Sequence, residues 1–239
     1  MSEARYLDET TLFTFETTVE AVRGDDRVVL NETCFYPTGG GQPHDTGTLR
    51  AKGEEWRVVD VKKRDRIEHI VEGTVPEVGT TVTGTIDEDR RRAHMRYHTA
   101  QHLLSSILLT EFDAETTGNQ LYHDHAHLDC AYERFDDEDL QTIEDRMNEL
   151  VADDLPVRWY TLDRDEAEAT LDPERTRLHL LPDSIREVRI VEIGDTETPL
   201  DQTACAGTHV ESTGEIGTVA VTGRTTQGSE HERIGFELE

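Results

Sequence analysis

Hydrophobic and polar positions alternate in short runs along the first third of the chain, which is the pattern of half-buried β-strands. Four such runs cover residues 11–22, 26–30, 56–61 and 80–86. Turns that contain glycine separate them, at Arg23-Gly24-Asp25, at Gly39-Gly40-Gly41 and at Gly73. Short strands at this spacing predict a small barrel or barrel-like sheet over residues 1–88.

The period of the pattern becomes helical after residue 88. Apolar side chains recur at helical spacing over residues 89–111, and Asp87 or Asp89 can cap the start of this helix. Later runs predict further elements, namely a hairpin over 115–121 and 127–132, an acidic helix with a solvated face over 136–152, strands over 157–162 and 186–193, and two strands around residues 223–228. Because helices and strands mix without strict βαβ alternation, we predict an α+β fold. A glycine-rich, barrel-like domain would occupy residues 1–88, and an α+β domain residues 89–239.

The charge of the chain is extreme. Acidic residues number 52 against 24 basic ones, a formal net charge of −28. The hydrophobic periodicity argues against disorder, and in molar salt the Debye length of about 3 Å mutes the repulsion between carboxylates. We therefore interpret the chain as a folded protein of a halophilic cytoplasm. Such acidity normally counts against RNA binding, because RNA binding usually gains free energy from counterion release at basic residues. In molar salt most of this free energy is lost for any protein, so the acidity is a weaker argument against RNA binding.

Two further features bear on the compartment. The three cysteines, Cys34, Cys130 and Cys205, are too few for a disulfide framework and fit a reducing cytoplasm. No apolar run reaches the roughly eighteen residues of a membrane span, and the first residues lack a signal-peptide pattern, so we expect no membrane association.

Two pairs of metal-binding side chains stand out. His98 and His102 lie four residues apart on the predicted helix, so their imidazoles share one face. Cys205 and His209 show the same spacing far downstream, in a loop of small residues. Either pair alone is a common surface feature, but together they offer three imidazoles and a thiolate, a ligand set suited to Zn²⁺. A peptidase of the HExxH type is excluded, because Thr99 replaces the glutamate that such enzymes need.

At these residues the sequence resembles a known family. The segments RYHTAQHLL and CAGTHV are similar to the editing domain of alanyl-tRNA synthetases, and the upstream YPTGGGQPHDTG is similar to their glycine-rich motif. The chain is too short for a synthetase, so it resembles the free-standing editing proteins of the AlaX type in their medium-length form. A related editing domain occurs in threonyl-tRNA synthetases, so the metal motifs alone do not define the tRNA.

The resemblance implies a role for several residues. It implies that zinc is surrounded by His98, His102, Cys205 and His209, and that the protein deacylates alanine tRNA charged with serine, or with glycine. Because four protein ligands would close a tetrahedral site, we expect either that one of them, His209, binds loosely and takes part in catalysis, or that the zinc becomes five-coordinate. The family also places a threonine against the serine hydroxyl. Thr116 and Thr117 are the candidates, and we choose Thr117.

Further candidates for substrate binding are a glycine-rich loop, with Gly40, Gly41 and Gln42, and an arginine cluster that includes Arg92 and Arg96. A plain β-turn and ion pairs within the helix are the competing interpretations. His123, His125 and His127 would share one face of a strand. Two other functions stay open: an editing domain for another tRNA, such as threonine tRNA, and a non-enzymatic RNA-binding module that zinc stabilises.

Overall fold

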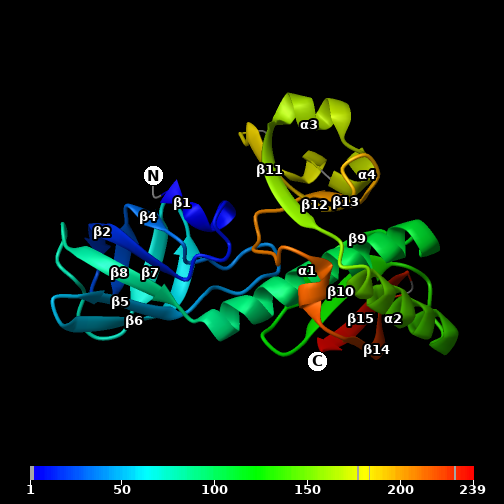
Figure 1. Ribbon diagram of the computed structural model, residues 1–239, viewed down its shortest axis with the longest axis horizontal. Helices are drawn as coiled ribbons and strands as arrows, with labels where there is room; N and C mark the ends of the chain where they lie inside the picture. Colours follow the sequence, from blue (N-terminus) through cyan, green and yellow to red (C-terminus); the bar gives the residue numbers. More distant parts are fainter. Residues whose placement is uncertain (1–2, 177, 183, 229) are drawn as a thin grey trace. The chain divides into compact units, whose positions relative to one another are not determined.

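The computed structural model describes residues 3–176, 178–182, 184–228 and 230–239. The chain forms two compact units, Met1–His94 and Met95–Glu239 (Figure 1). The long helix predicted from the periodicity is present as α1 (Glu88–Phe112), and it runs through the division between the units. None of the described helices combines the length and the hydrophobicity that crossing a membrane requires.

The first unit is built on a closed six-stranded barrel. The order around the barrel is β2-β3-β7-β6-β5-β8. The strands are β2 (Thr14–Arg23), β3 (Arg27–Leu30), β5 (Gly47–Ala51), β6 (Glu54–Lys63), β7 (Ile67–Val71) and β8 (Thr81–Ile86). In β2 the alternation places Phe15, Thr17 and Val19 inside. The expected barrel is therefore present, with the short strands β5 and β7 in addition to the four predicted runs. Outside it, β1 (Glu3–Ala4) pairs in parallel with β4 (Glu32–Thr33), and a 3₁₀ turn, η1 (Arg5–Leu7), follows β1.

A buried ion pair fixes the first turn of α1 within this unit. The side chains of Arg91 and Asp45 are both fully buried. The Nε atom of Arg91 donates to both carboxylate oxygens of Asp45 at 3.1 Å, and its Nη atoms donate to the backbone oxygens of Thr10 at 2.8 Å and Cys34 at 2.6 Å. Asp45 also accepts the backbone N–H of Tyr36 at 2.6 Å. The pair therefore ties the start of the helix to both ends of the glycine-rich segment.

The second unit contains two antiparallel sheets. One has the strand order β14-β15-β10-β9, with β9 (Thr116–Leu121), β10 (Ala126–Ala131), β14 (Val219–Gly228) and β15 (His231–Leu238). The other has the order β11-β12-β13, with β11 (Val157–Asp163), β12 (Glu187–Gly194) and β13 (Pro199–Ala204). The helical elements are α2 (Asp137–Ala152), α3 (Arg164–Thr170), α4 (Pro173–Thr176), η2 (Leu178–Leu180) and η3 (Thr213–Ile216). Strand β13 was not predicted, because its sequence PLDQTA lacks an apolar alternation.

Helix α2 agrees with its prediction and adds a buried side. Asp136 is its N-cap and forms a reciprocal capping box with Asp139. Ile143, Met147 and Leu150 are buried in the core, at the spacing of one helical face, whereas the acidic side faces solvent.

One sequence-based expectation is wrong at a turn, and one conditional grouping of histidines does not apply. The last hairpin does not turn at residues 223–228, because β14 continues to Gly228 and β15 begins at His231. Bulges at Gly223 and Gly228, where φ is +131° and +146°, keep these glycines within the strand. His123 and His125 do not lie on a strand with His127. They belong to the turn between β9 and β10, which the bond from Tyr122 N to His125 O closes at 2.8 Å.

Candidate metal centre and its cavity

Helix α1 supplies two of the candidate ligands. His98 and His102 lie one turn apart, and both are buried, with only 4% and 8% of their surface exposed. Their ring centroids are 5.5 Å apart. The helical spacing thus does what the sequence predicted: it aims both imidazoles at the same side of α1.

The loop that follows β13 supplies the other two. Its conformation is fixed by Arg189 on β12, whose Nη1 donates to the backbone oxygens of Cys205 at 2.7 Å and Gly207 at 3.0 Å. The backbone N–H of Gly207 donates to Cys205 Sγ at 3.3 Å, a contact that favours the thiolate. This tight loop presents Cys205 and His209 toward α1.

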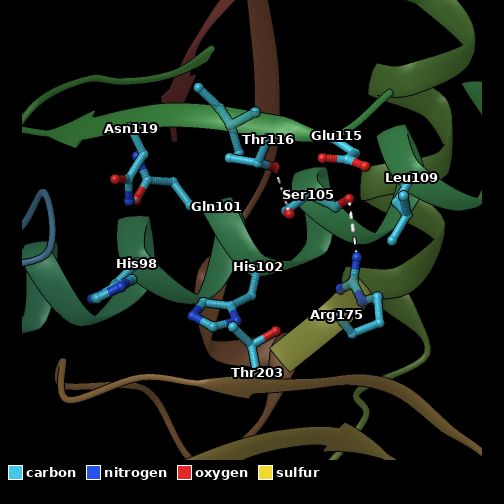
Figure 2. A pocket seen from close by; sticks show the side chains of 11 residues that line it. His98, Gln101, His102, Ser105, Leu109, Glu115, Thr116, Asn119, Arg175 and Thr203 are labelled. Carbon is cyan, nitrogen blue, oxygen red and sulfur yellow. Dashed lines mark hydrogen bonds between the residues drawn. The ribbon is translucent and has the colours of Figure 1, made fainter. Parts of the chain in front are cut away.

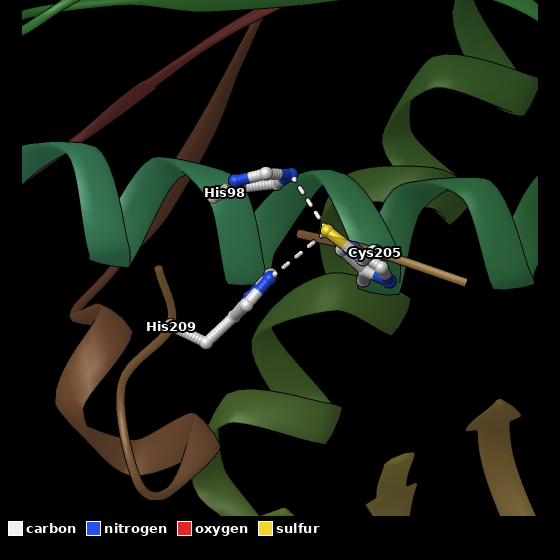
Figure 3. Close-up of side chains that lie close together, drawn as sticks. His98, Cys205 and His209 are labelled. Carbon is white, nitrogen blue, oxygen red and sulfur yellow. Dashed lines mark hydrogen bonds between the residues drawn. The ribbon is translucent and has the colours of Figure 1, made fainter. Parts of the chain in front are cut away.

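Figure 3 shows three of the four side chains, with His98 and His209 directed at the sulfur of Cys205. The ligand atoms of all four side chains lie within 4.8 Å of one another. Cys205 Sγ lies 3.5 Å from Nε2 of His98 and 3.4 Å from Nε2 of His209. Three buried imidazoles and one partly buried sulfur in a cluster of this size fit the donor set of a tetrahedral transition-metal site, and zinc above all.

Hydrogen bonds behind the cluster orient two of the imidazoles. Asp201 on β13 accepts from Nδ1 of His102 at 2.7 Å, which leaves Nε2 facing the cluster. Thr99 Oγ1 donates to the Met95 backbone oxygen at 3.0 Å and therefore accepts from Nδ1 of His209 at 3.1 Å. Such partners commonly fix the tautomer of a metal-binding histidine. His209 is thus buried and fixed like the others, and the geometry does not distinguish it as a loosely bound ligand.

The sequence reasoning missed both supporting residues. Thr99 entered only as the residue that excludes a peptidase. Asp201 carried one signal: it is a carboxylate four residues before Cys205, on the same short segment. In the structure Asp201 is 98% buried, and its second oxygen accepts from Arg175 and, at 2.8 Å, from Thr203.

Protonation in the cluster follows from burial and from these contacts. Burial disfavours a charged His102, but its hydrogen bonds to Asp201 and Cys205 outweigh burial and raise its pKa to about 10. Burial would raise the pKa of the Cys205 thiol, but the neighbouring imidazoles of His98 and His209 hold it well below its usual value. Burial lowers the pKa of His209 to about 3. A thiolate and a neutral imidazole are the forms that bind metals, so metal binding would mainly displace the proton of His102.

Replacing Asp201 with asparagine is expected to weaken metal binding about 10- to 100-fold, the usual effect of losing a partner of a metal-binding histidine. The amide keeps the shape of the side chain but loses the charge that orients His102. Titration of metal-free protein with Zn²⁺ against a competing chelator measures the change. Asp172→Asn, which changes an exposed carboxylate directly before α4, is the control; equal affinities of Asp201→Asn and the wild type would contradict the assigned role.

A small cavity of about 160 Å³ adjoins the cluster (Figure 2). His98 and His102 form part of its wall, and β9 crosses the opposite side. The other lining residues come from α1, the start of β9 and the neighbouring strands and helix: Gln101, Ser105, Leu109, Glu115, Thr116, Asn119, Leu128, Arg175 and Thr203. Nine of the eleven lining residues have polar side chains, which can form hydrogen bonds with a small hydrophilic ligand.

The structure places Thr116, rather than Thr117, at this cavity. Thr116 Oγ1 and Ser105 Oγ are hydrogen-bonded at 2.7 Å, whereas Thr117 is exposed and is not part of the lining. The pairing shifts between Asp129↔Gly118 and Cys130↔Thr116, so Thr117 is the extra residue of a β-bulge. This bulge is what turns Thr116 to the same side as Asn119. The choice of Thr117 therefore differs from the geometry, because a bulge changes the alternation that the sequence pattern assumes.

The remaining predicted site residues are not among those that line the cavity. Gly40, Gly41 and Gln42 belong to the first unit, where Gly39 and Gln42 exchange both backbone hydrogen bonds across a turn with φ of +57° and +81° at its centre. Arg92 in the same unit pairs with Glu88 at 2.8 Å. In the second unit, Arg96 donates to the backbone oxygen of Ile216 at 2.7 Å and does not line the cavity. Both arginines thus have structural partners.

Two family models match the chain. The model for class II tRNA synthetases of the alanine type covers residues 4–90. The model for the second additional domain of threonyl and alanyl tRNA synthetases covers residues 188–235, which include Cys205 and His209.

Individual proteins match over the whole chain. The alanyl-tRNA editing protein AlaX-M of Methanosarcina barkeri is 40% identical over 100% of this chain and 99% of its own length. The AlaX-M of Methanosarcina mazei is 38% identical over 100% of this chain and 97% of its own length. The alanine–tRNA ligase of Archaeoglobus fulgidus is 38% identical over 92% of this chain, which corresponds to only 24% of the ligase. The chain therefore belongs to the family of AlaX-M alanyl-tRNA editing proteins.

Proposed function

We propose that this protein is a trans-acting deacylase that hydrolyses the ester bond of alanine tRNA wrongly charged with serine, and also with glycine. The observation that carries the proposal is the largely buried His₃Cys cluster at the wall of a small cavity, most of whose lining residues are polar. It occurs in a chain that matches editing proteins from end to end.

The residues of the cluster have distinct tasks in this proposal. His98, His102, Cys205 and His209 would hold a zinc ion, which supplies Lewis-acid chemistry when bound. Asp201 and Thr99 keep the imidazoles of His102 and His209 in the orientation that binding needs. His98 and His102 also form the wall of the cavity, so a substrate there lies directly beside the ligand set.

Selection of serine is a problem of a single hydroxyl group. A pocket that accepts alanine rejects serine poorly, which is why a separate editing site is needed. In the cavity, the hydroxyls of Ser105 and Thr116 form a pair in which either can be the donor. A serine hydroxyl can join this pair, whereas alanine would leave it partly unsatisfied.

Thr116→Val is expected to lower the removal of serine from alanine tRNA by about tenfold or more, because a lost hydrogen bond to a buried group costs about 1–3 kcal/mol. Hydrolysis of Gly-charged tRNA, which does not use this hydroxyl contact, should change much less. Thr117→Val is the matched control, since that threonine is exposed on the other side of the bulge. An unchanged ratio of serine to glycine removal in Thr116→Val would contradict the proposed role.

A second substrate is favoured by one observation: the model that covers Cys205 and His209 describes threonyl as well as alanyl tRNA synthetases. Deacylation assays with Ser-, Gly- and Ala-charged alanine tRNA and with Ser-charged threonine tRNA, in molar potassium chloride, separate the two. Our proposal predicts rapid hydrolysis of Ser- and Gly-charged alanine tRNA only. Preferential hydrolysis of Ser-charged threonine tRNA would show that the protein edits threonine tRNA instead. Absence of hydrolysis with all of these substrates would favour a non-enzymatic RNA-binding module.

A further inference from the structure

The end of the β9–β10 hairpin exposes a flat pair of rings. Tyr122 and His125 stack with centroids 4.3 Å apart and an interplanar angle of 16°. The His127 ring lies at 6.4 Å from Tyr122 on the same side. Tyr122 is 41% exposed, and only one other large hydrophobic side chain in the described residues, Val78, is exposed as well. Core packing does not explain an aromatic pair that faces solvent.

The sheet leaves this pair accessible on its outer side. Leu121, Leu128 and Phe236 face the core, so the residues between them face outward. His127 is opposite Gln120 on β9 and opposite Gly235 on β15, and this outer side carries no buried hydrophobic residue there. Strand β9 is an edge of the sheet. A ligand on the outer side can therefore pass over this edge toward the cavity without crossing another strand.

The ring pair is rigidly linked to the candidate active site. Asn119 lines the cavity and lies three residues before Tyr122, a separation of about 10 Å along an extended strand. Gln101, on the helical turn between the two ligand histidines, donates to the backbone oxygen of His127 at 3.0 Å and accepts from Asn119 at 3.2 Å. The hairpin thus has a fixed position relative to the metal cluster.

The chemistry of the hairpin end differs from that of the rest of the surface. Residues 122–125 carry three rings and one carboxylate, and this carboxylate, Asp124, is hydrogen-bonded to His125 at 2.7 Å. Elsewhere the chain has about two acidic residues for each basic one. In molar salt, electrostatic attraction to phosphates contributes little, and stacking of bases on aromatic rings remains as a source of affinity.

We propose that the Tyr122–His125 ring pair stacks an unpaired base near the 3′ end of the tRNA, while the terminal ribose lies at the cavity. This inference rests on the proposed function for its ligand. Single-stranded RNA ends offer unstacked bases, and tyrosine and histidine rings are their usual stacking partners. The contact would not depend on which base is present, because every base has a flat aromatic face.

Binding of uncharged alanine tRNA in molar salt tests this contact without depending on hydrolysis. Tyr122→Ala is expected to weaken binding about tenfold, within the range for a lost stacking partner. Tyr122→Phe keeps the ring and should bind like the wild type. Val78→Ala, which removes the other exposed hydrophobic side chain, is the matched control and should have no effect. Circular dichroism verifies that each variant is folded.

Two further substrates make the result specific. A tRNA without its single-stranded 3′ end should bind the wild type and Tyr122→Ala equally. Seryl-adenosine, which has no neighbouring base, should be hydrolysed at the same kcat/KM by both proteins, whereas charged tRNA should show a raised KM in the variant. Unchanged tRNA binding by Tyr122→Ala, or an equal loss with the truncated tRNA, would overturn the inference. A wild type that binds but hydrolyses nothing would instead reject the proposed function.

Discussion

Replacing Cys205 with serine is expected to abolish stoichiometric zinc binding and to lower deacylation of Ser-charged alanine tRNA by more than about 100-fold. The 100-fold limit follows from a comparison. Loss of a residue that only supports a metal ligand lowers metal affinity or activity about 10- to 100-fold, so loss of a ligand itself should lower them more. Cys205 supplies the sulfur of the cluster, which lies 3.5 Å from Nε2 of His98 and 3.4 Å from Nε2 of His209. A hydroxyl is a much poorer zinc ligand than a thiolate.

Zinc content by mass spectrometry or atomic absorption, together with initial rates, measures both effects. Cys130→Ser is the matched control, because Cys130 is a buried free thiol in the same unit, and its Sγ donates to the backbone oxygen of Glu232 at 3.6 Å. That variant should lose some stability but keep its zinc. Full zinc occupancy in Cys205→Ser would show that the sulfur is dispensable and that the four-ligand cluster has been wrongly assigned.

Replacing Arg91 with methionine is expected to destabilise the first unit by about 3–5 kcal/mol, the usual cost of leaving one member of a buried ion pair without its partner. Methionine fills a similar volume, so most of this loss comes from the carboxylate of Asp45, which is fully buried. The backbone oxygens of Thr10 and Cys34 lose donors as well. Denaturant unfolding in molar salt gives the change in the free energy of unfolding.

The adjacent Arg92 provides the control. Its ion pair with Glu88 is half-exposed on both sides, and such pairs contribute about 0–1 kcal/mol. Arg92→Met should therefore be nearly neutral, although it removes the same charge one residue away. In a double variant, Asp45→Leu with Arg91→Met, the loss should be smaller than the sum of the two single losses. Equal effects of Arg91→Met and Arg92→Met would contradict the assigned structural role.

The same two arginines show what a sequence can and cannot predict. Adjacent basic residues at a helix start suggested a single cluster for substrate binding, with ion pairs inside the helix as the alternative. The structure separates them: Arg92 pairs within the helix, whereas Arg91 is buried against a residue 46 positions away. Such a partner has no local signature, because the pairing depends on how the barrel closes.

Elements with a strong period were predictable. The helix that bears His98 and His102, the barrel and the capped helix at 137 all follow from local patterns, and the ligand pairs follow from their spacing. The sides that Thr116 and Thr117 face were not predictable, because one extra residue in β9 reverses the alternation along the strand. Asp201 was missed for a similar reason, because its hydrogen bond to His102 depends on the position of β13 beside α1.

Removal of the metal followed by its return tests the central claim. The claim is that four side chains from two distant parts of the sequence bind one metal ion, and that hydrolysis depends on this ion. Deacylation of Ser-charged alanine tRNA is measured in molar salt before chelation, after it, and after adding stoichiometric Zn²⁺, with circular dichroism at each stage. We predict that chelation abolishes hydrolysis while most of the fold remains, and that zinc restores the rate. Undiminished hydrolysis by metal-free protein would contradict this account.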